Sequence, residues 1–376
     1  MSVIINGDTG IDKITDGSIV AADIGSGEVT QAKLASGFPL GKRNLIINGD
    51  MRIAQRGTSA SGASSGNTYK TIDRFSFGLS SAGTWTMSQD TDVPSGKGFA
   101  NSLKLDCTTA NGSLSAGSTL FINHKMEGQN LQHLKYGTSN AEKLTLSFWV
   151  KSNKTGTYIL ELDQDGNAKN YCQSYSITSA DTWEKKTITY DGDTVSSLAN
   201  DNTNELEVHF WLGAGTDYTS GTLATSWEST TNANRAVGQV NLADSTSNYI
   251  NITGVQLEVG DAASDFEFVP YDMELARCHR YYWQKTEAVQ GSKYSSFAGA
   301  QTSTVINSML ILPVTMRTDP TLTASAYSQV GLGASPTSIS GSVYSDTVVR
   351  IGFTVSGAVA NNVGILNFDI LANAEL

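Results

Sequence analysis

The sequence predicts a mainly β protein. Apolar and polar residues alternate in many short runs, which is the period of a strand with one face in water. The chain has 36 Gly but only 6 Pro, and Ser, Thr and Asn fill most gaps between the runs, as is typical of tight polar turns. Only 16% of its 376 residues are charged, well below the roughly 25% of ordinary soluble domains. The length accommodates roughly two or three domains, each with a sizeable core.

The N-terminal segment, residues 1–43, differs in kind from the rest, since no aromatic residue precedes Phe38. It contains a short internal repeat, in which residues 17–24 are echoed by residues 27–34. Copies this short bury little apolar surface by themselves. The segment is therefore either a flexible linker or a thin stem that attaches the protein to a partner.

Residues 44–268 are predicted to form a jelly-roll β-sandwich. Long polar loops separate the alternating runs, a spacing that favours two packed sheets. The runs lie at residues 102–107, 143–150, 158–162, 187–190, 206–212 and 248–259. In the last run the alternation slips at Gly254, where a β-bulge is expected. A short helical turn around residues 130–134 would cover one end of the sandwich.

A short linking helix is predicted for residues 269–286, because the apolar spacing changes after Pro270 to three, four and seven residues. Residues 287–376 then form a distal C-terminal β-sandwich. Its strands are expected at residues 304–312, 321–326, 348–355 and 365–370. A domain this small with few large apolar residues has a thin core, so burial against identical chains is expected. The candidates for that burial are Leu310, Ile311, Leu312, Ile365, Leu366 and Phe368.

The charge, the hydropathy and the cysteine spacing argue against binding to nucleic acid, a membrane or a metal. The net charge is −11 and no segment concentrates Lys or Arg, which argues against a nucleic-acid partner. No run of about 18 apolar residues and no secretion signal occurs, so membrane insertion is not expected. Cys107, Cys172 and Cys278 follow no metal-binding spacing, and we expect free, mostly buried thiols in a protein made in a reducing cytoplasm.

The sequence offers little for catalysis, and neither an enzyme nor a cofactor is predicted. The four histidines, His124, His133, His209 and His279, lie outside any nucleophile motif. Paired carboxylates occur at Asp163/Asp165 and Asp191/Asp193, where Asp and Gly first indicate turns. A bound calcium and a pair of catalytic acids are the alternatives for these pairs.

Aromatic residues in polar surroundings point to a carbohydrate ligand, since sugar C–H faces stack on flat rings while neighbouring amides and acids bind the hydroxyls. Trp227 follows Asp217 and Tyr218 in a polar stretch, and Tyr171 with Tyr175 forms a second candidate pair. The alternative is that these rings cover a sandwich end or a contact between chains. Trp149, Trp183 and Trp211 occur in strand-like runs and are predicted to lie in the core.

Several motifs are spread over residues 44–376. They are Asn44-Leu-Ile-Ile-Asn-Gly-Asp50, Gln55-Arg-Gly57, Ile72-Asp-Arg-Phe75, Glu127-Gly-Gln-Asn-Leu131, Leu144–Ser152, Thr155–Tyr158, Thr182–Ile188, Gln256-Leu-Glu-Val-Gly260, Pro270-Tyr271, Glu274–Tyr282, Leu312–Thr321 and Ala374-Glu-Leu376. Together they resemble the motifs of bacteriophage tail-fibre and receptor-binding proteins. The resemblance is specific for a fibre architecture and weak for any particular ligand.

The resemblance implies a homotrimeric fibre in the virion, held by phage tail proteins through the N-terminal stem and attached to a host cell-surface glycan. Such a protein is made in the host cytoplasm and released by lysis. A purely architectural collar or baseplate fibre that binds other virion proteins fits the same features. A polysaccharide depolymerase is disfavoured, because the long β-helix repeats usual in such spikes are missing from the sequence.

Overall fold

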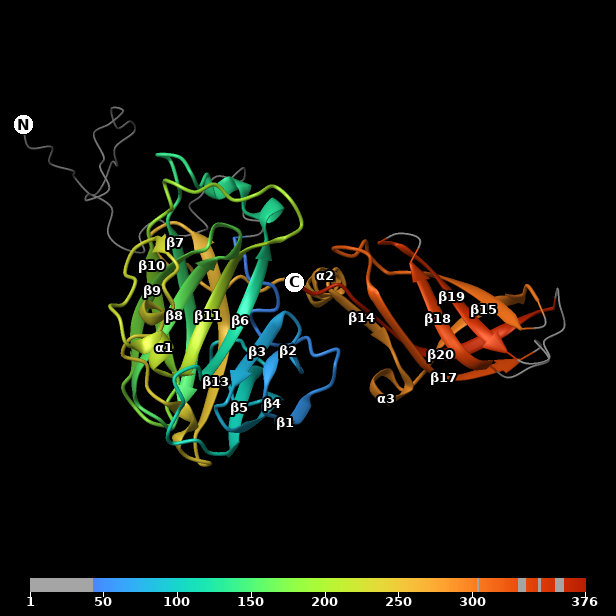
Figure 1. The fold of residues 1–376 in the computed structure, drawn as a ribbon, viewed down its shortest axis with the longest axis horizontal. Coiled ribbons are helices and arrows are strands. Elements are labelled where there is room, and N and C mark those ends of the chain that lie inside the picture. The colour runs from blue at the N-terminus through green and yellow to red at the C-terminus, as the bar shows by residue number, and fades with distance from the viewer. Residues whose placement is uncertain (1–42, 303, 331–335, 344–345, 356–361) are drawn as a thin grey trace, which may run out of the picture. The chain divides into compact units, whose positions relative to one another are not determined.

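The structure is a computed structural model, and Arg43–Leu376 form one compact unit within it. The residues that it describes are 43–302, 304–330, 336–343, 346–355 and 362–376. The stem predicted for residues 1–43 lies, except for Arg43, outside these residues. The described chain is mainly β, with two antiparallel sheets that form a sandwich and a third sheet towards the C-terminus (Figure 1).

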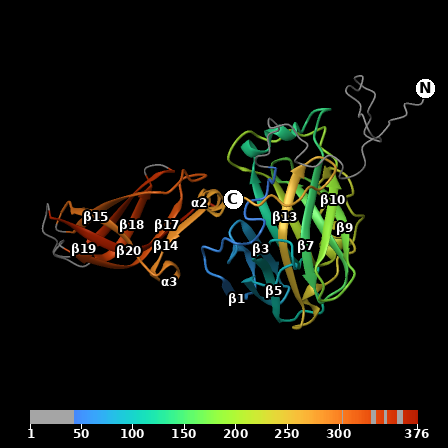
Figure 2. The ribbon, with the colours of Figure 1, turned by 180° about the vertical axis from the view of Figure 1, so that it is seen from behind.

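The first layer of the sandwich is a six-stranded antiparallel sheet. In spatial order its strands are β1 (Ser59–Ala63), β4 (Thr84–Asp90), β5 (Ser102–Thr109), β13 (Tyr249–Val259), β7 (Leu144–Ser152) and β10 (Glu184–Tyr190). Strands β13 and β7 lie in front when the sandwich is seen from behind (Figure 2). The register of β13 shifts between Thr253 and Gln256, and Gly254 has φ +62°, so the predicted bulge is confirmed.

The second layer is a seven-stranded antiparallel sheet. In spatial order its strands are β12 (Glu228–Ser229), β9 (Lys169–Ile177), β8 (Gly156–Gln164), β11 (Asn204–Ala214), β6 (Thr119–Glu127), β3 (Phe75–Ser80) and β2 (Gly66–Tyr69). One core fills the space between the layers, because the central strands have apolar residues at alternate positions that point inward. Phe148 of β7, for example, packs edge-on against Tyr175 and Phe210 of the opposite layer, with ring centroids 5.2 Å apart in both pairs.

The six strands predicted between residues 102 and 259 are present as β5, β7, β8, β10, β11 and β13. The helical turn predicted near residue 130 is a pair of 3₁₀ turns, Gly128–Asn130 and Gln132–Leu134. All three cysteines are free and buried, as predicted. Among the described residues, no helix is long and apolar enough to span a membrane.

The predicted linking helix is α2 (Tyr271–His279), which begins directly after Pro270. Its N-terminal cap is Pro270. Asp272 and Glu274 occupy the first turn, where their negative charges interact favourably with the positive end of the helix dipole. The chain then enters the third sheet through β14 (Tyr282–Lys285), followed by the short helix α3 (Glu287–Gln290).

The third sheet is also antiparallel, and four of its strands match the predicted ones. Its further strands are β15 (Tyr294–Ala300), β16 (Val305–Ile311), β17 (Thr321–Val330), β18 (Pro336–Val343), β19 (Val348–Val355) and β20 (Val363–Asn373). Strand β20 pairs with β14 and β15 and also with β17. Among the side chains that the structure describes, ten buried residues form the core on one face of this sheet, and three of them are alanines.

The residues predicted for burial between chains divide into two groups. Leu310, Leu312, Leu366 and Phe368 are buried within the chain itself, so the prediction is wrong for them. They share the inner face of their strands, whereas Ile311 and Ile365 alternate with them and are exposed.

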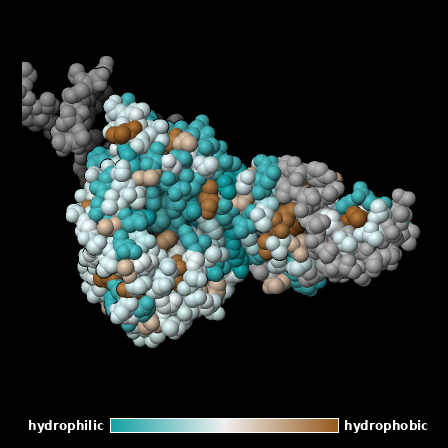
Figure 3. Space-filling model, in the orientation of Figure 1, coloured by the Kyte–Doolittle hydropathy of each residue, from teal (hydrophilic) through white to brown (hydrophobic). Residues whose placement is uncertain are grey.

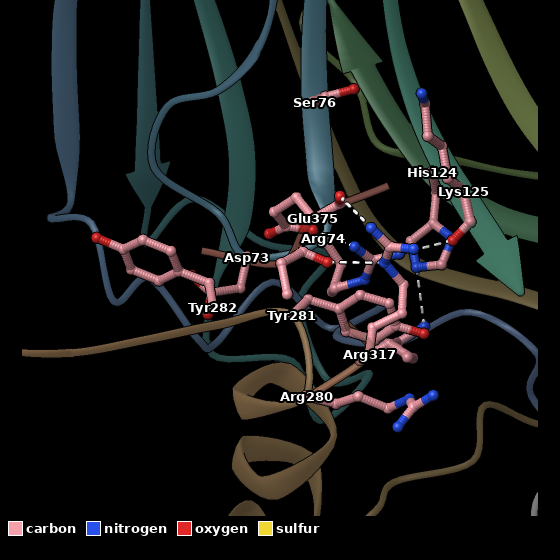
Figure 4. A network of polar contacts seen from close by, with 12 residues as sticks. Asp73, Arg74, Ser76, His124, Lys125, Arg280, Tyr281, Tyr282, Arg317 and Glu375 are labelled. Atoms are coloured by element: carbon pink, nitrogen blue, oxygen red, sulfur yellow. Dashed lines mark hydrogen bonds and ion pairs between the residues drawn. The ribbon is translucent and has the colours of Figure 1, made fainter. Parts of the chain in front are cut away.

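A buried polar network joins the sandwich to the third sheet (Figure 4). The guanidinium of Arg74 is fully buried and pairs with the carboxylate of Glu375. It also donates to the carbonyl oxygen of Lys125 at 2.7 Å and lies 3.5 Å above the centroid of the Tyr281 ring. Arg56 adds a second ion pair to Glu375, with Nη2 3.0 Å from Oε1.

The same network continues through other residues of the motifs described above. Glu127 accepts two hydrogen bonds of 2.7 Å from Arg280, and Arg317 donates to the carbonyl oxygens of Asn202 and Ala374. Burial raises the pKa of Asp73 to about 7, partly offset by the neighbouring charge of Arg56. The motif residues therefore meet at the connection between the sandwich and the C-terminal segment.

Candidate functional site

Two of the predicted ligand-binding residues, Tyr171 and Tyr175, lie in the sandwich core and are 5% and 6% exposed. They are four residues apart on strand β9, so they share one face of it, and that face is the inner one. Tyr175 stacks on Tyr158, and Tyr171 packs edge-on against Tyr190. Neither ring has a free face for a sugar, and the prediction is corrected for this pair.

Trp227 is partly buried at the edge of the sandwich. Its indole Nε1 donates to the carbonyl oxygen of Asp191 at 2.7 Å, and its ring packs edge-on against Tyr136 and Tyr171. These contacts anchor the loop that carries Trp227 on the core. They match the alternative interpretation, in which the ring covers an end of the sandwich.

Asp217 and Tyr218 belong to the short helix α1 (Thr216–Thr219). Asp217 is exposed, whereas the ring of Tyr218 is half-buried and lies tilted on Trp211, with centroids 5.5 Å apart. Trp211 is 1% exposed as predicted, but it belongs to the outward side of the seven-stranded sheet rather than to the main core. Tyr218 therefore lies beside that outward side.

The prediction of core positions is wrong for Trp149 and Trp183, which are half-buried. Trp149 alternates with the inward residues of β7 and so points outward from the six-stranded sheet, where Lys97 lies 5.7 Å above its ring. Trp183 donates from Nε1 to a carboxylate oxygen of Asp92 at 2.9 Å.

The paired acids are only partly in turns. Asp165 begins a 3₁₀ turn, Asp165–Asn167, and Asp193 accepts the backbone N–H of Val195 at 2.9 Å, both as expected of turns. Asp163 instead occupies strand β8 and points outward. Among the described residues, no cluster of His, Cys, Asp and Glu has the arrangement of a metal site.

The outward side of β3, β6, β11 and β8, called the outer face below, carries a concentrated set of polar residues. Inward positions on these strands are apolar, so the alternating positions collect on the outside. Cross-strand pairing aligns them in three rows: Gly78–Phe121–Trp211, Ser76–Asn123–His209–Glu161 and Lys125–Glu207–Asp163. Most of these residues are buried, and the sandwich surface that faces the viewer in Figure 3 is largely hydrophilic.

Hydrogen bonds between side chains connect the second of these rows with the third. Ser76 donates to the Oδ1 of Asn123, whose Nδ2 donates to Glu207 at 2.7 Å. His209 Nε2 lies 2.7 Å from the Oε2 of the same glutamate. Its Nδ1 has no hydrogen-bond partner among the described residues, although the side chain is almost fully buried.

Arg235 closes the other end of the outer face. Its guanidinium donates to Glu161 through Nε at 2.7 Å and Nη2 at 3.1 Å, and through Nη2 to Asp163 at 2.9 Å. Glu161 also accepts the indole N–H of Trp211 at 2.8 Å. The side chain of Glu161 is fully buried, whereas Arg235 and Asp163 are 16% and 15% exposed, so these two reach solvent.

The electrostatics of the outer face separate its acids. Burial, together with the charge of Glu161, raises the pKa of Asp163 to about 6. Burial opposes ionisation of Glu207 too, but the hydrogen bond and charge of His209 outweigh it and lower the pKa of Glu207 to about 2. The same contact raises the pKa of His209 against its burial. Glu207 and His209 therefore form an ion pair at slightly acid pH.

An aromatic ring lies next to these charges. The ring of Phe121 covers Gly78 on the neighbouring strand, where a Cβ atom would approach it to 2.2 Å. Its centroid is 5.0 Å from that of His209 and 5.4 Å from that of Trp211. The half-buried ring of Phe121 is thus held between Gly78, His209 and Trp211, and the guanidinium of Arg235 lies 5.6 Å above the centroid of the neighbouring Trp211 ring.

The sequence interpretation included Tyr218 but missed the outer face. Glu161 and Asp163, and likewise Glu207 and His209, stand two residues apart with apolar residues between them, which places each pair on one face of a strand. The pairing of β11 with both β6 and β8 then brings these pairs together. That pairing joins residues far apart in the chain.

No family model and no curated protein matches the chain. Among solved structures, a bacteriophage CBA120 tailspike protein 4 domain is 15% identical with a TM-score of 0.30; the match covers 58% of this chain and 22% of that one. A putative sugar-binding protein from Bacteroides thetaiotaomicron is 14% identical with a TM-score of 0.31, covering 58% of this chain and 100% of the other. A family 11 carbohydrate-binding module from Clostridium thermocellum is 12% identical with a TM-score of 0.25, covering 58% and 96%. Similarity at this level is distant and assigns no family.

Proposed function

We propose that the protein is a non-enzymatic bacteriophage tail fibre that attaches the virion to a glycan on the host surface, with the outer face as its glycan-binding site. One observation carries the choice of site. The partly exposed ring of Phe121 shares the outer face with partly exposed side chains that donate or accept hydrogen bonds, Lys125, Arg235 and Asp163. That combination suits a sugar, which has an apolar C–H face and a rim of hydroxyl groups.

In the proposed complex, the C–H face of one sugar residue stacks on Phe121, and hydroxyls further along the glycan bind Arg235, Asp163 and Lys125. The buried row beneath them holds these groups in place before the ligand arrives, which reduces the entropy lost on binding. An open sheet face gives a weak single site. Several copies of the site on one particle would raise the effective affinity through avidity.

The assembly proposed with this function is a homotrimer with a jelly-roll head, held by phage tail proteins through residues 1–43. The protein would be made in the host cytoplasm, released by lysis and carried in the virion, without a nucleic-acid partner or membrane insertion. Support comes from the motifs in residues 44–376 and from the net charge of −11. An acidic protein at an anionic cell surface has to rely on short-range hydrogen bonds and stacking.

The test is a glycan array probed with the full chain and matched variants. Phe121→Ala and Asp163→Asn should each weaken binding at least tenfold, about 1.4 kcal/mol. Phe268→Ala and Asp261→Asn remove the same chemical groups from exposed positions elsewhere and should leave binding unchanged. Absence of any glycan binding by the wild type contradicts the adhesive function. Loss of binding with Trp149→Ala, but not with Phe121→Ala, would place the site on the six-stranded sheet instead.

An architectural collar or baseplate fibre is the second candidate. The exposed apolar side chains of the third sheet favour it, because they suit a protein surface better than a sugar. Imaging the particle distinguishes the two functions by whether the C-terminal sheet points outward or lies against another virion protein. Shortened chains after incubation with host polysaccharide would indicate a depolymerase and contradict the non-enzymatic proposal.

A further inference from the structure

The third sheet exposes a group of large apolar side chains on its outward side. The exposed fractions are 84% for Phe297, 77% for Val363, 72% for Ile311, 65% for Val330, 62% for Met309 and 40% for Ile365. Single exposed apolar residues are common on soluble proteins, but a contiguous group marks an interaction site. Figure 3 shows hydrophobic side chains at the surface of the part that carries this sheet.

Strand pairing makes the group contiguous. Val330 of β17 is opposite Ile365 of β20, and Ile365 is opposite Phe297 of β15. The pairing of Ala298 with Ser308 places Met309 of β16 next to Phe297 on the same side. A continuous apolar row therefore crosses four strands, with Ile311 and Val363 flanking it. We call this surface the Phe297 face.

The size of the Phe297 face is that of an interface. The six side chains expose on the order of 600 Å², at the upper end of the patches found on monomeric proteins and near the roughly 800 Å² that each partner contributes to a standard interface. The neighbouring outward residues Ser295 and Asn307 are uncharged. The Phe297 face contains a groove lined by Phe297, Met309 and Val348, and a side chain of the partner can insert there.

We propose that the Phe297 face packs against the same face of the other copies of this chain in the homotrimer proposed above. The chain carries a net charge of −11, so identical copies repel unless an uncharged surface mediates their contact. Two apolar sheet faces pack on each other as the layers of a sandwich do. Such a contact would also add apolar burial to the third sheet.

This inference rests on the proposed function only in its multi-chain assembly, not in glycan binding. It also changes which residues form the contact. The inward residues Leu310, Leu366 and Phe368 take no part, while the outward residues Phe297, Met309 and Ile365 form its centre. In a closed symmetric assembly every copy contributes equivalent surfaces, so the same residues are buried in each chain.

The test measures the mass of the full chain in solution by light scattering and sedimentation over a wide concentration range. The wild type should be an oligomer, and the double variant Phe297→Ser/Met309→Ser should lose assembly and run with the mass of one chain. Val195→Ser removes a 77% exposed valine from the sandwich and should assemble as the wild type does. Circular dichroism confirms folding, and Ile311→Ser repeats the test if the double variant does not fold.

A wild type that stays a single chain at all concentrations overturns the inference, as does a folded double variant that assembles normally. Failure of the glycan-binding proposal would give a result distinguishable from failure of this inference. Phe121→Ala would then bind glycan as before, while the mass of the assembly responded only to changes in the Phe297 face.

Discussion

Glu375→Gln should destabilise the protein through the network that joins the sandwich to the third sheet. The substitution keeps the shape of the side chain but removes its charge, leaving the fully buried Arg74 and the nearly buried Arg56 facing a neutral amide. Loss of one partner from a buried ion pair costs about 3–5 kcal/mol. Arg56 keeps Asp73, with its Nη1 3.6 Å from Oδ1, and loss of the Glu375 charge also favours ionisation of Asp73. We therefore expect the lower end, about 3 kcal/mol.

Calorimetry is the suitable assay, because two separate cores can unfold in separate transitions. A loss of about 3 kcal/mol corresponds to a fall in Tm of about 6–12 °C for a domain of 150–250 residues. Glu142→Gln provides the control, since it removes the same charge from an exposed pair with Lys135 and should cost at most about 1 kcal/mol. Equal, small shifts for the two variants would refute the role assigned to Glu375.

Three further outcomes are expected. Trp227→Ala should lower the free energy of unfolding in urea by about 2–4 kcal/mol, since its ring packs on the core; normal stability with lost cell adsorption would instead identify a ligand contact. Burial and the charge of Arg74 hold the pKa of His124 well below 6.5, so only the unfolded state takes up a proton there, and stability should fall as pH drops below about 6.5, less steeply in His124→Gln. Gly78→Ala should displace Phe121 and weaken glycan binding, which a titration with the glycan found on the array measures; unchanged affinity argues against stacking on this ring.

The strands predicted from the sequence are those whose two faces differ. Strand β7 alternates buried apolar residues with outward Thr145, Ser147, Trp149 and Lys151. This two-residue period can be recognised in the sequence. Strand β3 was missed although its sequence, Phe-Ser-Phe-Gly-Leu-Ser, alternates, because the run is short and contains a glycine, which weakens the signal of a strand. Strand β15 was missed because its sequence, Tyr-Ser-Ser-Phe-Ala-Gly-Ala, has mostly small side chains.

The candidate site was less predictable than the fold. Tyr171 and Tyr175 were interpreted as loop residues from their polar neighbours, but a strand places residues four apart on the same face, here the inner one. The outer face depends on Asn123, Glu207 and Glu161 coming together from three strands. Periodicity assigns a residue to a face, but it does not say which strands become neighbours.

Five charged residues of the motifs that resemble tail-fibre proteins lie in the connection and none of these five in the outer face. Arg56, Arg74, Glu127, Arg280 and Glu375 all belong to the buried network. A buried polar network needs every member in place, which ties such residues to one arrangement. This explains why the motifs indicate an architecture and say little about a ligand.

The pairing of Arg74 with Glu375 links residues 301 positions apart. At the usual 5–20 residues per second, a ribosome takes roughly 15–60 s to pass from one codon to the other. Throughout that interval the strands around Arg74 can form, but the guanidinium lacks its carboxylate. The nascent sandwich therefore lacks this ion pair until Glu375 emerges, and the connection closes only after translation has passed that residue.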